Sequence, residues 1–348
     1  MPGDPAARNS LSFDIPRPPA ALINNPSIKL RYQHATVAVL KRGTVRKTIF
    51  HERWWLDIVA PDQWAEIVTD RGYLRYAYRT RMMFRSSQMP PLTRALGPVI
   101  QVDGRKTETR HRGAFNAICE LLDRLPDFDH VEFKLDPSFT DVLAFQARGF
   151  HASVQHTFQA DCRQPIENIW SEMRDKTRNI VRRAQDKLAV VATDDGEGFK
   201  NFYAQSLDRD KSYFGLYLIP ELFAAGHARG QARILAAVDQ GGEVHAQAFF
   251  LWDDHSYYYF LSSRQRAIAH AGAVSALIWA GMKHAHSLGL VFDFDGVTSQ
   301  SRYQFMVGFG GKLATRFAVA RGALLYDAQR GARAFKNRLI GRAAASFY

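Results

Sequence analysis

The chain has 348 residues, a formal net charge of +12 and 46% hydrophobic residues, among them 24 Phe, 13 Tyr and 6 Trp. This length and composition allow an extensive buried core, which excludes wholesale disorder and leaves room for two domains or one large one. The positive charge favours anionic partners, namely nucleic acid, nucleotide-linked metabolites or a lipid surface, without choosing among them.

Residues 1–28 contain six prolines and show no periodicity, so we expect a flexible Pro-rich tail without a secretory signal. The longest apolar stretch, AGAVSALIWAGM, is shorter than the ~20 residues that cross a bilayer. Cys119 and Cys162 are the only cysteines, and Cys119 shares the apolar stripe of GAFNAICELLDRL, which favours a buried structural thiol. We therefore expect a soluble, cytoplasmic protein.

The first half of the chain predicts alternating helices and strands. HERWWLDIVAPDQWAEIVTD indicates a helix, a turn and a strand, and RGYLRYAYRTR continues in strand-like alternation. MPPLTRALGPVIQVDG is a loop marked by Pro and Gly. GAFNAICELLDRL is an amphipathic helix, HVEFKLDP a strand, TDVLAFQARGF a helix and HASVQHTFQADC a strand.

A charged helix, WSEMRDKTRNIVRRAQDK at residues 170–187, connects this half to the next. The segment ARILAAVDQGGEVHAQAFFLWDDHSYYYFLSS predicts a meander of three strands. The helix AVSALIWAGMKHAHS, the strand LGLVFDFDG, the segment SRYQFMVGFGG and the strand KLATRFAVAR follow.

The two halves contain a concealed repeat. Each has an acidic strand, a short helix with an aromatic residue, a Gly-Phe pair and a closing strand, and Asp136 to Gly149 spans the same thirteen residues as Asp295 to Gly308. We therefore predict an α/β protein of two tandem lobes, each a mixed sheet flanked by helices. The N-terminal lobe covers 29–160, the C-terminal lobe with the linking basic helix covers 161–325, and a basic helix covers 326–348.

This pattern resembles the closing unit of the GNAT N-acyltransferase fold. Two such lobes joined by KTRNIVRRA resemble the FemAB-like branch, specifically its acetyltransferase-like members associated with polysaccharide biosynthesis. WWLDIVAP, PPLTRALGP and FDFDGVTSQSRYQFMVGFGG are similar to landmarks of that family and extend the resemblance over most of the chain.

The resemblance implies transfer of an acyl group from acyl-CoA, acetyl-CoA above all, to an amine of a nucleotide- or lipid-linked amino sugar or cell-envelope precursor. No metal and no covalent enzyme intermediate are implied, and the sequence has no CxxC, HExxH or GxSxG motif. An aminoacyl-tRNA donor, or a non-catalytic binding module with this fold, is the alternative. DNA is not an expected partner.

Asp293 and Asp295 are the first catalytic candidates. They alternate with Phe292 and Phe294 in VFDFDG, so both carboxylates should project from one face of a strand. Such a pair could attract and deprotonate an ammonium group, although acidic residues at a strand end also serve as turn or helix caps. Tyr303 could protonate a leaving thiolate or pack in the core.

The donor is expected at LSSRQRAIAHAGAVSALIW, where the amide groups that begin a helix could bind a pyrophosphate. The GNAT loop normally reads Gln/Arg-x-x-Gly-x-Gly/Ala, but aligned on Gly272 this chain has Ala269 and Val274 in the first and last places. Arg264, Gln265 and Arg266 could substitute from upstream, or could form a plain exposed basic loop.

Lys176, Arg178, Arg182 and Arg183 lie on the face of the charged helix opposite its apolar stripe. They could neutralise the phosphates of an acceptor bound in the cleft between the lobes, or could simply be solvated. The segment 326–348 is a basic amphipathic helix that could contact anionic lipid or RNA, or dock with a charged exterior. His245 in EVHAQAFF could act as a base, but a packed, hydrogen-bonded strand histidine is the better interpretation.

Overall fold

The structure is a computed structural model that describes residues 45–81, 83–103, 106–207, 215–265, 270–296 and 299–322. These residues belong to one compact unit of the chain that begins at Gly43. The predicted tail over 1–28, the predicted helix over 326–348 and the donor candidate Arg266 lie outside the described residues.

The first half alternates helices and strands as its sequence predicts. In chain order its elements are η1 (Ile49–His51), α3 (Arg53–Val59), β1 (Trp64–Thr69), β2 (Gly72–Ala77), β3 (Arg79–Arg81), β4 (Phe84–Ser87), β5 (Pro98–Ile100), α4 (Thr107–Asp123), β6 (His130–Lys134), α5 (Leu143–Gln146) and β7 (His151–Asp161).

The second half contains the predicted three-strand meander, which is β9 to β11. Its elements are α6 (Ile166–Glu172), α7 (Asp175–Gln185), β8 (Ala189–Thr193), α8 (Gly196–Ser206), η2 (Leu216–Leu218), α9 (Ile219–Ala228), β9 (Ala232–Val238), β10 (Val244–Trp252), β11 (Ser256–Arg264), α10 (Ala273–Leu288), β12 (Val291–Gly296), α11 (Gln300–Gly308) and β13 (Lys312–Gly322).

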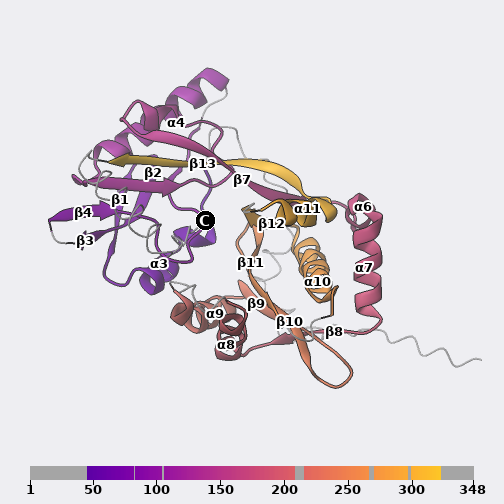
Figure 1. Ribbon diagram of the computed structural model, residues 1–348. Helices are drawn as coiled ribbons and strands as arrows, with labels where there is room; N and C mark the ends of the chain where they lie inside the picture. Colours follow the sequence, from indigo (N-terminus) through magenta and orange to yellow (C-terminus); the bar gives the residue numbers. More distant parts are fainter. Residues whose placement is uncertain are drawn as a thin grey trace, which may run out of the picture. The chain divides into compact units, whose positions relative to one another are not determined.

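One sheet runs through both halves, in the strand order β3-β4-β6-β13-β7-β12-β11-β10-β9-β8, and β1, β2 and β5 form a small second sheet. The repeat is confirmed as strand, helix and strand: β6-α5-β7 and β12-α11-β13. Its closing strands cross over, because β7 pairs with β12 and β13 pairs with β6. The two closing strands also pair with each other along their length, side by side in Figure 1.

The predicted α/β class, with mixed sheets flanked by helices, is therefore confirmed. The boundary near residue 160 stays a prediction, and it falls at the end of β7, where the sheet continues into β12.

Three apolar clusters form the core. One belongs to the first half except for Val319, and one to the second half except for Phe158 and Ala160 of β7. The third joins the halves, because Phe50 and Trp55 pack against Phe260 at ring-centroid distances of 6.4 and 5.7 Å. Both cysteines, Cys119 and Cys162, are unpaired and buried, as expected for structural thiols.

The single helix predicted over 170–187 is wrong, because the chain breaks it between α6 and α7. Met173 and Arg174 have extended ψ angles of 142° and 140°, and the Arg174 amide donates to the carbonyl of Gly308 at 2.9 Å. The Arg178 guanidinium then donates to the carbonyls of Ser171 and Met173 at 2.9 and 2.6 Å, which satisfies the end of α6. The predicted apolar stripe is nevertheless buried, with Met173, Ala184 and Leu188 in the core.

Candidate functional site

β11 and β12 are parallel neighbours that pair only where they begin. The register joins Ser256 to Val291, Tyr257 to Phe292 and Tyr258 to Asp293, and it stops there although β11 continues to Arg264. The two strands therefore diverge toward their carboxyl ends. Polar backbone groups on the diverging edges are left for side chains or a ligand to satisfy.

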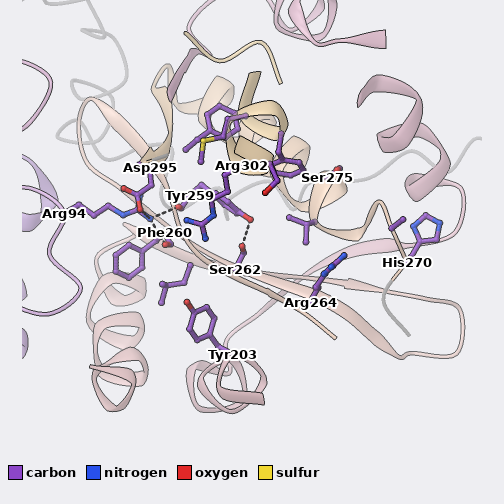
Figure 2. Close-up of a pocket in the computed structure, with 18 residues that line it drawn as sticks. Arg94, Tyr203, Tyr259, Phe260, Ser262, Arg264, His270, Ser275, Asp295 and Arg302 are labelled. Atoms are coloured by element: carbon purple, nitrogen blue, oxygen red, sulfur yellow. Dashed lines mark hydrogen bonds and ion pairs between the residues drawn. The ribbon is translucent and has the colours of Figure 1, made fainter. Parts of the chain in front are cut away.

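A cavity of about 760 Å³ lies at this divergence. Its walls come from β11, the start of α10, β12 and α11, and Arg94 from the loop after β4 and Tyr203 from α8 complete it (Figure 2). Its polar lining residues are Arg94, Tyr203, Tyr259, Ser262, Arg264, His270, Ser275, Asp295, Ser301 and Arg302. Carboxyl ends of strands beside a helix start are a frequent position for ligands in α/β folds.

Asp295 is the one carboxylate among the described residues that line the cavity. Its φ of 74° lies in the left-handed region, where β12 departs from regular pairing with β7. Arg94 contacts one carboxylate oxygen at 3.3 Å and Arg316, from β13, approaches the other at 3.5 Å. Burial alone would raise the pKa of Asp295, but the charges of Arg94 and Arg316 outweigh it and hold the pKa below its ordinary value. This carboxylate stays ionised, which favours binding an ammonium group over accepting its proton.

Asp293 has a different surrounding from Asp295, because the irregularity between Asp293 and Gly296 interrupts the alternation that should have placed both side chains on one face. Asp293 is buried and accepts hydrogen bonds from Thr157 at 2.7 Å and Gln159 at 2.9 Å. It also accepts the backbone amide of Asp295 at 2.8 Å. Asp293 does not line the cavity, and its contacts hold the turn that presents Asp295.

Tyr259 supplies a second polar group to the cavity, and its hydroxyl donates to Ser262. Burial raises the pKa of Tyr259, so the hydroxyl stays protonated and keeps its ability to donate near neutral pH. Tyr303, the predicted acid, is 42% exposed, packs its ring edge against Phe158 and does not line the cavity. Its catalytic role stays a prediction.

The opposite end of the cavity lies at the start of α10, where Arg264 and His270 are lining residues. His245 holds this end in place: its Nδ1 accepts the backbone amide of His270 at 3.0 Å and its Nε2 contacts Asp239 at 3.1 Å. These contacts are those of a packed strand histidine, as the sequence favours. Gln265 joins the same support, because its backbone amide donates to the His245 carbonyl at 3.0 Å.

Gly272 caps the start of α10 and allows close contact with α7. A Cβ there would lie 2.9 Å from Ala184 Cβ and 3.0 Å from the Ile180 carbonyl oxygen, so only glycine lets the helices approach this closely. Gly272 itself is not a lining residue, whereas its neighbours Ala271 and Val274 are. The predicted donor loop thus borders the cavity.

The four basic candidates of α7 lie outside the cavity lining. Lys176, Arg182 and Arg183 are exposed. Arg182 also stacks over Trp170 at 5.3 Å, and Arg178 is occupied in capping α6. Binding of acceptor phosphates by these residues stays a prediction.

Residues 172–304 match the family described as acetyltransferase (GNAT) domain. This segment is a GNAT acetyltransferase domain, so the protein is an acyltransferase. The matched segment contains β11, α10 and β12, hence most of the cavity walls of the enzyme. The GNAT domain implies, in general, an acyl-CoA donor and an amine acceptor.

Solved structures share this fold. The acyltransferase superposes on the crystal structure of FemX with a TM-score of 0.58 and 13% identity, over 79% of this chain and 93% of that one. A conserved protein of unknown function from Bacteroides thetaiotaomicron gives a TM-score of 0.52 and 9% identity, over 77% of this chain and 87% of that one. Among curated proteins none matches. The predicted GNAT fold is thereby confirmed, and FemX shares that fold over most of both chains.

Sequence patterns did not reveal Arg94 and Arg302 as residues of the site of the acyltransferase. Arg94 lies in a loop in the first half, and only the folded chain brings it to β11 and Asp295. Its position within PPLTRALGP was the available signal. Arg302 lies in the first turn of α11, after its N-cap Ser299, and directly precedes Tyr303, the residue that the sequence favoured.

The described residues form neither a metal-binding cluster nor a membrane-crossing helix. Within them, three or more His, Cys, Asp or Glu side chains nowhere come together in a way that could hold a metal ion. None of the helices they form combines the length and the apolar character needed to cross a membrane.

Proposed function

We propose that the protein is an N-acyltransferase that moves an acyl group, foremost acetyl, from acyl-CoA to an amine of a nucleotide- or lipid-linked amino sugar or cell-envelope precursor. The observation that carries this proposal is the cavity between the diverging strands β11 and β12, with Asp295 at one end and the start of α10 at the other.

The donor would lie between the diverging strands. Its amide groups could pair with the free edge of β11, and its phosphates would meet Arg264, His270 and the start of α10. Gln265 and Gly272 would support this end through backbone and packing contacts, which fits their positions behind the lining residues.

The acceptor amine would approach Asp295. The ammonium first loses one proton to solvent, and the neutral amine nitrogen then forms a bond to the thioester carbonyl carbon. The C–S bond breaks, the nitrogen releases a second proton, and the leaving thiolate takes up a proton, so the products are an amide and the free thiol of CoA. Asp295 would orient the incoming ammonium rather than take its proton, because its two arginine neighbours lower its pKa. Tyr259 remains protonated and could donate to the leaving sulfur.

The exposed side chains Lys176, Arg182 and Arg183 of α7 would contact phosphates of an acceptor that extends beyond the cavity. The proximity of α7 to the start of α10 supports this extension. The two unpaired, buried cysteines support a cytoplasmic setting, and contact with the inner membrane face would involve the segment over 326–348.

A thermal-shift titration of the full chain with acetyl-CoA, at low and moderate salt, tests the proposal. A ligand at about 100 times its dissociation constant adds ~2.7 kcal/mol to the free energy of unfolding. We expect a saturable, salt-tolerant rise in melting temperature that Ser262→Met weakens. Absence of any rise would contradict acyl-CoA as the donor.

The +12 net charge and the departures at Ala269 and Val274 support a second candidate, an aminoacyl-tRNA-dependent transferase. Its binding to charged tRNA should weaken steeply with salt, because bound phosphates release counterions. A filter-binding salt series separates it from the acyl-CoA enzyme.

A further inference from the structure

We infer that the acyltransferase recognises an oxyanion on its acceptor close to the reacting amine, and that Arg302 is the residue that binds it. The inference rests on the proposed function in one respect, namely that the amine is placed at Asp295. It adds a chemical requirement, since the acceptor must carry a carboxylate or phosphate within a few bonds of that amine.

The charges that line the cavity do not balance. Arg94, Arg264 and Arg302 line it together with His270, and Asp295 is the only carboxylate among the lining residues that the structure describes. That carboxylate is already flanked by two guanidinium groups, one from Arg94 and one from Arg316 behind it. Asp295 therefore leaves the other lining arginines without a carboxylate among the lining residues, and an anionic ligand would supply the missing negative charge.

Arg94 is held by the protein and cannot be the main ligand group. Its guanidinium donates to the carbonyl oxygens of Tyr259 and Phe260 at 2.8 and 2.5 Å while it contacts Asp295. Its side chain is only 10% exposed, and its Nη1 has no hydrogen-bond partner in the described part of the chain. This unpaired donor adds positive potential at the Asp295 end of the cavity, where an anion would be stabilised.

Arg302 is the cation that remains available at this end. It is exposed, lines the cavity from α11, and its guanidinium makes no hydrogen bond or ion pair with any residue that the structure describes. Its charge reaches the reacting end, because it helps to lower the pKa of Asp295 and opposes the rise of the pKa of Tyr259. In Figure 2 it projects between Asp295 on one side and Arg264 and His270 on the other.

Arg264 cannot take this role. It ends β11 and, like His270, lies away from Asp295 and Arg94 in the view of Figure 2. Phosphates of the donor would therefore engage Arg264, and an anion next to the amine would engage Arg302. A guanidinium fork suits both carboxylate and phosphate, so the geometry defines an oxyanion and the experiment decides which kind.

Three small amines of equal spacer length test the inference: O-phosphoethanolamine, β-alanine and ethanolamine. Each carries an ammonium group two carbons from a phosphate, a carboxylate or a hydroxyl, so only the anion differs. They are titrated into the full chain, with and without saturating acetyl-CoA, and the apparent Kd is read from the thermal shift. We expect one or both anionic amines to bind at least tenfold more tightly than ethanolamine.

Variants then assign the position. Arg302→Gln should weaken the anionic probe by about 10- to 100-fold, the worth of a charge-assisted hydrogen-bonded pair, and leave the apparent Kd of acetyl-CoA within twofold. Arg302→Lys should recover part of the loss, because it keeps the charge without the fork. Arg264→Gln is the matched control, and it should weaken acetyl-CoA but leave the probe unchanged.

Three outcomes would overturn the inference. The first is equal binding of all three amines, or of none, to the wild-type chain. The second is weaker binding of the anionic amine to Arg264→Gln but not to Arg302→Gln. The third is weaker binding of the anionic amine to Lys176→Gln and Arg182→Gln alone, which would assign the anion to α7. Binding of acetyl-CoA in the same plates tests the proposed function separately, so the two can fail independently.

Discussion

The two strand-helix-strand repeats begin alike and end differently. In each, a parallel strand pairs only briefly with the opening strand of the repeat: β4 joins β6 at Ser86 and Ser87, and β11 joins β12 at three positions. In the first repeat the chain itself follows β6 beyond this point. The Lys134 amide contacts the sulfur of Met89 at 3.4 Å, and its carbonyl accepts the Leu96 amide at 2.8 Å.

The second repeat has no such covering segment among its described residues, and the cavity lies there. The loop that follows β6 in the first repeat also carries Arg94, which reaches β11 and Asp295 in the second. One loop therefore closes the first divergence and completes the site at the second. The repeated fold unit thus becomes a site only where the chain leaves the diverging strands apart.

The largest effect is expected at the aspartates that occupy equivalent places in the repeats. Asp295→Asn should lower the rate of CoA release with an amine acceptor by about 100- to 1,000-fold, because it removes the charge that orients the amine. Asp136→Asn is the matched control. The Asp136 carboxylate forms an ion pair with Arg46 at 3.1 Å, and Asp136 does not line the cavity. This variant should therefore lose stability but keep its activity per folded molecule.

Circular dichroism supplies the folded fraction for both variants, since Asp295→Asn also leaves Arg94 and Arg316 without their carboxylate. Equal losses of specific activity in the two variants would remove the functional distinction between the repeats.

The next effect concerns the closed divergence of the first repeat. Leu96 is 1% exposed, and Leu96→Ala should lower the free energy of unfolding by roughly 3–4 kcal/mol. Urea denaturation measures it, and Leu313→Ala, at a leucine that is 55% exposed, should change it by less than about 0.5 kcal/mol. An equally small change in the free energy of unfolding for Leu96→Ala would mean that this loop does not pack against β6.

The surroundings of Asp136 and Asp295 should also differ in acid sensitivity. His51, whose charge interacts with that of Asp136, is buried, and desolvation lowers its pKa to about 4. Its unfolded pKa is near 6.5, so its contribution to stability is complete above pH ~6.5 and falls by about 3 kcal/mol as the pH drops to ~4. Asp295 responds only at lower pH: its pKa is lowered, so its contribution persists until the pH falls below ~3.9.

Urea denaturation between pH 8 and pH 4 checks this difference. His51→Gln should be less stable than the wild type at pH 8 and should lose less stability between pH 6.5 and pH 4. An unchanged loss in the variant would assign the acid sensitivity to other groups.

The smallest effect tests the open divergence of the second repeat. Ser262 lines the cavity from β11, and Ser262→Met places a longer side chain between the diverging strands. We expect about tenfold weaker acetyl-CoA binding with a change in unfolding free energy under ~1 kcal/mol. Ser153→Met, on an exposed position of β7, is the control and should bind acetyl-CoA as the wild type does.

Much of this fold could be predicted from local patterns. Alternation over 232–263 predicted the meander, the thirteen-residue spacing predicted the repeat, and VFDFDG led to Asp295. Local patterns failed where a distant contact decides the structure. The break after Met173 depends on Gly308, more than a hundred residues away, and the site role of Arg94 depends on β11. The left-handed φ of Asp295 likewise cannot be read from its neighbours, because a bulge sets it.

The crossing of the closing strands has a consequence for synthesis on the ribosome. β6 is complete at Lys134, yet its partner β13 ends at Gly322, so almost two hundred residues separate the emergence of the two strands. During that interval the edges of β6 and β7 lack their permanent neighbour, which exposes nascent chains to edge-to-edge association. Long-range pairing of this kind also slows folding. The enzyme should therefore depend on chaperone capacity during expression, and a chain stopped before Lys312 should accumulate as aggregate instead of as an isolated first half.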